Sequence, residues 1–293
     1  MSQDQHFLPQ VYLRQWCQDG RVLRYRRVGP ERRLEAVRKS PRGVAFEPDL
    51  YSVPVGGAAN GLTGNELEVR LASDVDARLP ALVQRVSLIS GELRDEVLRG
   101  DVVWLMQTFC ARNPNSIARV QDGVGDFVKA QRPTIERMLA RANTESARTE
   151  LLKYLAPRMP AVAARAGLAA VVDRNLPSDL RWLDGDVHVV PFALVAKAIR
   201  SAGACEFVTF EDPVVAWDAN SNGLVASFSM LPGAMVLVAA RGGGFGVQEY
   251  ADAALRHLLI PPGYRGNLIC RTELSSHVLA AAGRLRPSDD AGP

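Results

Sequence analysis

Residues 5–16 of the chain read Gln-His-Phe-Leu-Pro-Gln-Val-Tyr-Leu-Arg-Gln-Trp, and this stretch decides how the N-terminal segment enters the fold. Pro9 predicts the first position of a helix, because its ring presets the helical backbone angle and its missing N–H is not needed there. The helix is expected to run to about Gln18, where Asp19-Gly20 stops it. His6 then precedes the helix, near its positive end.

The bulk composition is that of an ordinary globular protein. The 293 residues are 47% hydrophobic and 23% charged, with a formal charge of +3, so the chain can bury a core without disulfides or metal. Four scattered cysteines without a Cys-x-x-Cys pair favour free thiols in a reducing cytoplasm. The polar N-terminus and the lack of a long apolar run predict no signal peptide and no membrane partner. We therefore expect one cytoplasmic domain over residues 1–285 and a disordered tail over 286–293.

An arginine-rich hairpin is predicted after the first helix. Residues 21–27 and 33–38 alternate as two strands around a Val-Gly-Pro-Glu turn at 28–31. Two interpretations stay open: a solvated face, or a surface that contacts phosphates. In the second interpretation, the residues that contact nucleic acid would be Arg14, Arg24, Arg26 and Arg33.

The middle of the chain, residues 63–173, is predicted to be predominantly helical. A capping box at 63–66 opens the first helix, and Pro80 breaks or kinks it. Apolar residues recur every three or four positions after Glu92, and Asn113-Pro114 ends that helix. Further helices are expected over 116–129, 133–141, 144–154 and 160–172.

The pattern changes after residue 177. Helices are expected over 191–201 and 247–259, and short β-type runs over 205–210, 214–217, 224–229 and 235–240. The sequence therefore predicts an α+β fold. It consists of an N-terminal helix and β-hairpin (5–54), a helical middle (63–173), and a mixed C-terminal region with a small, mainly antiparallel sheet (178–285).

Two adjacent acids mark a candidate site. An apolar strand ends in Glu211 and Asp212, and the chain becomes apolar again after Pro213. Such carboxylates can hold a metal ion or a proton, or Asp212 can satisfy backbone N–H groups in a turn. Arg112, at a helix end, either complements the helix dipole or points into the site. The glycine-rich stretch 241–246 lacks the Lys-Ser/Thr of a phosphate-binding loop and is expected to be a turn.

Several of these stretches, in this order, resemble one known family. The pattern His6-x-x-Pro9-Gln10-x-Tyr12-Leu13-Arg14, followed by Asp19-Gly20, is similar to the opening of domain-of-unknown-function family 4238. The segment 46–51, the helix end at 112–114 and the acidic bend before Pro213 resemble its later blocks. The resemblance extends from about Gln5 to Leu258.

The sequence departs from the family pattern at two places. The family's usual Ser-Asp-Asn-Pro is Phe210-Glu211-Asp212-Pro213 here, so an acid is kept, the hydroxyl is lost and the amide becomes Asp212. Glu66 and Glu68 are present, whereas Asp74 or Asp76 stands where a second glutamate is expected. The resemblance implies an inactive protein if the family's serine is a nucleophile, and a competent one if its acid binds a metal ion.

Two functions of different classes fit these residues. The first is a nuclease or other phosphodiesterase of bacterial toxin or anti-phage defence type, with nucleic acid as partner and a divalent ion (Mg²⁺ or Mn²⁺) as cofactor. Its catalytic residues would be His6, Gln10, Arg112, Glu211 and Asp212. Its metal ligands would be His6, Glu66, Glu211 and Asp212. The second is a non-enzymatic binding or assembly module, with a buried hydrogen-bond cluster formed by His6, Gln10, Tyr12 and Arg112.

Overall fold

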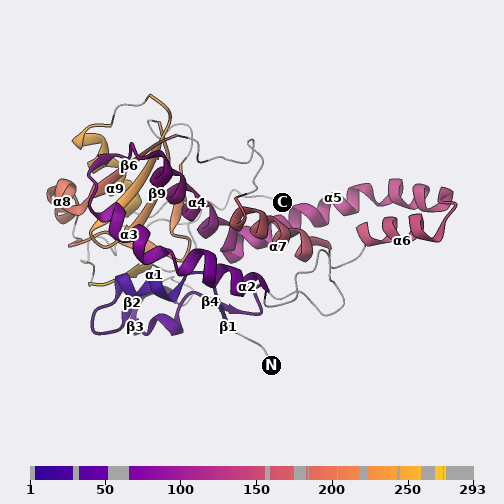
Figure 1. Ribbon diagram of the computed structural model, residues 1–293. Helices are drawn as coiled ribbons and strands as arrows, with labels where there is room; N and C mark the ends of the chain where they lie inside the picture. The colour runs from indigo at the N-terminus through magenta and orange to yellow at the C-terminus, as the bar shows by residue number, and fades with distance from the viewer. Residues whose placement is uncertain are drawn as a thin grey trace.

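Helices and antiparallel sheets make up the fold, which is α+β as the sequence predicts (Figure 1). The computed structural model describes residues 4–28, 33–51, 66–155, 159–174, 183, 185–202, 204–217, 223–242, 245–258, 268–272 and 274. Its α-helices are α1 (Gln10–Leu13), α2 (Glu66–Arg70), α3 (Leu79–Ser87), α4 (Glu96–Arg112), α5 (Pro114–Arg141), α6 (Glu145–Tyr154), α7 (Met159–Val172), α8 (Phe192–Ser201) and α9 (Val247–Leu258). Two 3₁₀ turns and one π-helical turn are η1 (Arg14–Trp16), η2 (Pro41–Gly43) and η3 (Leu71–Asp76).

The strands of the described residues pair in antiparallel fashion. They are β1 (Asp4–His6), β2 (Val22–Val28), β3 (Arg33–Lys39), β4 (Phe46–Pro48), β5 (Gly91–Glu92), β6 (Asp186–Pro191), β7 (Thr209–Phe210), β8 (Val214–Ala216), β9 (Leu224–Leu231), β10 (Ala234–Ala239) and β11 (Leu268–Cys270). They form a pair β1-β4, a sheet β3-β2-β11-β7 and a sheet β5-β6-β10-β9-β8.

The predicted arginine-rich hairpin is present as β2 and β3, and it belongs to a larger sheet. On its other side β2 pairs with β11, so that Leu23 lies opposite Cys270. β7, which leads into the acidic bend, lies on the far side of β11. Strands from the two ends of the described chain therefore share one sheet.

The N-terminal stretch folds largely as its sequence predicts. Pro9 caps α1, which starts one residue later and continues as η1 to Trp16. Asp19 and Gly20 then adopt positive φ angles of 52° and 71°, as the predicted stop requires. The sequence did not reveal that residues 4–6 form β1, in which His6 lies opposite Phe46 of β4.

The helical middle is confirmed, with one correction. Asn113-Pro114 separates α4 from α5, as predicted. The first helical run is interrupted just before Pro80, as predicted, but Pro80 lies in the first turn of a further helix, α3, that the sequence analysis did not predict. The break expected at Pro133 is absent, because α5 runs through it without interruption. A proline keeps a helical φ and removes one backbone hydrogen bond, a cost that a long helix can tolerate. None of the helices within the described residues is long and apolar enough to span a membrane.

The predicted C-terminal helices and strands are present, and β6 and β11 are additional strands that the sequence analysis missed. Several expectations lie outside the described residues: the start of the capping box at 63–65, most of the turn at 28–31, part of the glycine-rich stretch, and the tail 286–293. Glu66, the last residue of the capping box, begins α2.

The residues 114–155, which contain α5 and α6, form an arm that extends away from the sheets (Figure 1). α7 packs along the part of α5 nearest α4, and α6 packs along α5 as well. Ile117 is the one residue of α5 whose side chain is buried. By contrast, Val120, Phe127 and Met138 are 45%, 62% and 52% exposed. The arm therefore presents apolar side chains to solvent.

Tyr12 connects α1 to both large sheets through a buried hydroxyl. Its oxygen lies 2.6 Å from the carbonyl oxygen of Ser229 in β9 and 2.6 Å from Thr209 Oγ1 in β7. Since the carbonyl only accepts, Tyr12 donates to Ser229 and accepts from Thr209. These bonds fix the N-terminal helix directly against the strand that precedes the acidic bend.

His257 of α9 forms a second buried polar contact with β9. Its Nδ1 lies 2.7 Å from Ser227 Oγ and its Nε2 lies 2.9 Å from Ser229 Oγ. The side chain is 1% exposed, and burial lowers the pKa of the imidazole to about 4. His257 is therefore a neutral, structural histidine at physiological pH.

Candidate functional site

Arg112 is the centre of the candidate site, and its helix explains why. It follows Leu105 and Phe109 by seven and three residues, so that all three side chains lie on the buried face of α4. At the C-terminus of the helix the guanidinium is favourably placed against the helix dipole. Arg112 is only 1% exposed, which is exceptional for an arginine.

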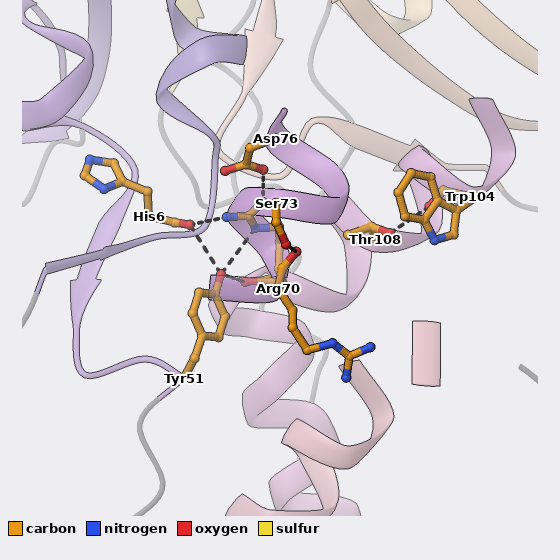
Figure 2. Close-up of polar contacts among 8 residues, drawn as sticks. His6, Tyr51, Arg70, Ser73, Asp76, Trp104 and Thr108 are labelled. Atoms are coloured by element: carbon orange, nitrogen blue, oxygen red, sulfur yellow. Dashed lines mark hydrogen bonds and ion pairs between the residues drawn. The ribbon is translucent and has the colours of Figure 1, made fainter. Parts of the chain in front are cut away.

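Each nitrogen of the guanidinium donates to a group of the protein (Figure 2). Nη1 donates to Asp76 Oδ1 over 2.8 Å, and Nη2 donates to the carbonyl oxygen of His6 over 2.7 Å. Nε lies 3.4 Å from the hydroxyl of Tyr51. The charge is therefore paired and its donors are used inside the protein, as a buried arginine requires.

Tyr51 and Gln5 complete what we call the Arg112 cluster: Gln5, His6, Tyr51, Asp76 and Arg112. The Tyr51 hydroxyl donates to the carbonyl oxygen of Arg112 over 3.1 Å. The backbone N–H of Tyr51 donates to Gln5 Oε1. Burial raises the pKa of Tyr51 to about 12. Because Gln5 is completely buried, this cluster fixes β1 onto the end of α4.

The imidazole of His6 points away from the cluster, whose members use only its backbone carbonyl (Figure 2). Its Nε2 donates to the carbonyl oxygen of Arg42 over 3.2 Å, and its ring lies 5.7 Å from that of Phe46. Burial lowers the pKa of His6, and the charged groups that also act on it are Arg112, Asp4 and Asp76. The acids of the bend at residues 211–212 are not among them.

The acidic bend lies against the other side of the same helix end. Asn113, the residue after Arg112, donates through Nδ2 to the carbonyl oxygen of Glu211 over 3.1 Å. The carboxylate of Glu211 pairs with Arg24 of β2 at 3.0 Å. Burial raises the pKa of Asp212 to about 6, and the positive charge of Arg119 acts in the opposite direction. The N-terminal segment and the bend thus meet at the junction of α4 and α5.

The four predicted metal ligands do not come together as one site. All four belong to the described residues, and within these no group of three or more His, Cys, Asp or Glu side chains is arranged to hold a metal ion. His6 bonds to Arg42, Glu66 is exposed at the start of α2, and Glu211 pairs with Arg24. Gln10, predicted to be catalytic, is the half-buried first residue of α1.

The arginines predicted to contact nucleic acid lie in different environments. Arg26 pairs with Glu35 of the neighbouring strand at 2.7 Å, and Arg24 pairs with Glu211. Arg14 is exposed in η1. Arg33 begins β3, and its side chain lies outside the described part of the chain. Two of the four positive charges are therefore already compensated by carboxylates.

Sequence reasoning missed three members of the site. Tyr51 had a signal, because it ends one of the blocks that resemble the family, and Asp76 was one of two possible helix acids. Gln5 had none, since the strand β1 was not predicted. Glu68 lies nearby: burial raises its pKa, and its Oε2 has no hydrogen-bond partner within the described part of the structure.

These features define an α+β protein in which a buried arginine, Arg112, holds β1, η3 and α4 together. A family model described as "Protein of unknown function (DUF4238)" matches residues 4–160. This match covers more than half of the chain, so the chain belongs to that family, as the resemblance predicted. No curated protein and no solved structure matches it.

Proposed function

We propose that this chain is a non-enzymatic binding or assembly module, in which the Arg112 cluster is structural. The observation that carries this proposal is the environment of the guanidinium: it is 1% exposed, and each of its nitrogens donates to a protein group. An arginine that binds a substrate phosphate needs donors that are free and reachable. The surface that supports binding is the arm, with its exposed apolar side chains.

A cytoplasmic location is part of this proposal. All four cysteines are free, namely Cys17, Cys110, Cys205 and Cys270. Free thiols are typical of proteins that work in a reducing compartment.

The proposal is tested by comparing His6→Ala with Gln5→Ala. We expect His6→Ala to change the free energy of unfolding by about 1 kcal/mol or less, because the cluster uses only the backbone carbonyl of His6. Gln5→Ala leaves the buried N–H of Tyr51 without the acceptor that Gln5 Oε1 provides. This variant is expected to lower the free energy of unfolding by about 1–3 kcal/mol. Urea unfolding of both variants measures these values.

The same proteins are incubated with single- and double-stranded DNA and RNA in the presence of Mg²⁺ or Mn²⁺. The wild type is expected to cleave none of them. A wild type that cleaves any of them would falsify the module proposal, and a His6→Ala variant that is inactive but equally stable would then assign His6 to the reaction.

A second candidate, a nucleic-acid-directed phosphodiesterase, is favoured by one observation. Asp212 has a pKa of about 6 and lies in the field of Arg119, and a carboxyl group that titrates near neutral pH is typical of general acid–base sites. This candidate predicts metal-dependent cleavage by the wild type and at least a hundredfold loss in Asp212→Asn, on the scale of about 10²–10⁴ for a general acid or base. Asp252→Asn, at an exposed position of α9, is the matched control.

A further inference from the structure

Three exposed apolar side chains of the arm lie along a single line of α5. Val120, Phe127 and Met138 follow one another after seven and eleven residues, which correspond to about two and three turns of a helix. α6 and α7 also pack against α5, yet these three side chains stay between 45% and 62% exposed. We call this line the α5 stripe.

The charges beside the α5 stripe are self-complementary. Asp126 and Arg137 are also eleven residues apart, so they lie on the same flank of the helix. Arg137 donates only within its own helix, to the carbonyl oxygen of Pro133 and to Thr134 Oγ1, and has no carboxylate partner in the described part of the chain. Asp126 pairs with Lys129 at 3.1 Å, but both side chains are more than 70% exposed and such a pair contributes little.

We propose that the arm pairs with the arm of a second copy of this chain, in an antiparallel arrangement about a two-fold axis. In such a pair each contact occurs twice, because residue i faces residue j and j faces i. When Phe127 lies against Met138 of the second copy, these two side chains cover each other, and contacts between an aromatic ring and a thioether are favourable.

The same register also pairs the charges. Because like flanks face each other in an antiparallel pair, Asp126 comes within about one turn of Arg137 of the second copy, and the symmetry repeats this contact. α5 is 28 residues long, about 42 Å, so the pairing can use a long, straight surface that projects from the rest of the protein (Figure 1).

The second copy is the partner that the proposed function leaves open, and the pairing rests on that function. Analytical ultracentrifugation of the full chain over a wide range of concentration is expected to show a reversible monomer–dimer equilibrium. Phe127→Gln is expected to raise the dimer dissociation constant at least about tenfold, since it removes the contact between Phe127 and Met138 of the second copy twice. Val97→Gln, at a 72% exposed position of α4, is the matched control and keeps the wild-type constant.

Charge reversal tests the register. Asp126→Arg and Arg137→Asp, each alone, are expected to weaken the dimer, and the double variant is expected to restore at least part of the loss. A chain that is monomeric at every concentration overturns the inference, and so does a Phe127→Gln protein that dimerises like the wild type. Single charge variants that weaken the dimer without rescue in the double variant overturn the antiparallel register. None of these outcomes affects the proposed absence of catalysis, which fails only if the wild type cleaves nucleic acid.

Discussion

Replacing Arg112 with methionine is expected to lower the free energy of unfolding by about 3–5 kcal/mol. The methionine keeps most of the buried apolar stem of Arg112 and removes its charge. Asp76 then remains as a carboxylate without its partner, and the carbonyl oxygen of His6 loses its shortest donor. Urea unfolding followed by circular dichroism measures the loss.

Two further variants separate the buried pair from arginine loss in general. Arg85→Met breaks the ion pair with Asp95, in which both side chains are about half exposed, and is expected to cost about 1 kcal/mol or less. Adding Asp76→Asn to Arg112→Met removes the orphaned charge and should recover part of the stability. A cost below about 1 kcal/mol for Arg112→Met contradicts the structural role of the cluster.

The stability of the fold between about pH 7 and pH 4 is expected to depend on two buried groups that act in opposite directions. The pKa of His257 falls from 6.5 to about 4 on folding, so the unfolded chain binds its proton more strongly. The contribution of neutral His257 to the free energy of unfolding is therefore complete above pH 6.5 and is lost as the pH falls toward 4. The pKa of Asp212 rises from 3.8 to about 6, so the folded chain binds its proton more strongly, and this contribution grows as the pH falls. Each of these two pKa shifts corresponds to a change of about 3 kcal/mol in the free energy of unfolding.

Single variants are expected to expose the two opposing slopes. Between neutral pH and pH 4, the free energy of unfolding of Asp212→Asn should fall by about 3 kcal/mol relative to that of the wild type. That of His257→Gln should rise by a similar amount relative to the wild type. Denaturant unfolding at a series of pH values gives both curves. Asp252→Asn, on the same helix as His257, should follow the wild type. Variant curves that run parallel to that of the wild type show that neither group titrates differently in the folded state.

Local patterns made most of the secondary structure predictable. Apolar spacing predicted the helices of the middle region, Pro9 and Asp19-Gly20 delimited the first helix, and alternation predicted the β2–β3 hairpin. The errors occurred where tertiary context decides. β1 has three residues and exists because it pairs with β4, and Pro133 stays helical inside a long helix.

The candidate site was predictable only in part: the sequence pointed to Arg112, His6 and the acidic bend, but not to Gln5, Tyr51 or Asp76. Arg112 and the acidic bend do lie at one junction, but the pattern could not show that His6 contributes its carbonyl and turns its imidazole toward Arg42. Every residue has a backbone carbonyl, so the identity of a residue does not show whether that carbonyl takes part in a site. Tyr51 and Gln5 meet only because two distant segments pair, which no spacing encodes.

The pairing of β2 with β11 has a consequence for biosynthesis. The carbonyl oxygen of Leu23 accepts from the thiol of Cys270, 247 positions further along the chain, so the chain up to Cys270 must leave the ribosome before β2 can pair with β11. Until then the hairpin exposes an open strand edge, which is a template for pairing with other nascent chains. Closing so long a loop is also slow. The hairpin β2–β3 is therefore made early in translation but cannot complete its sheet until β11 has been synthesised.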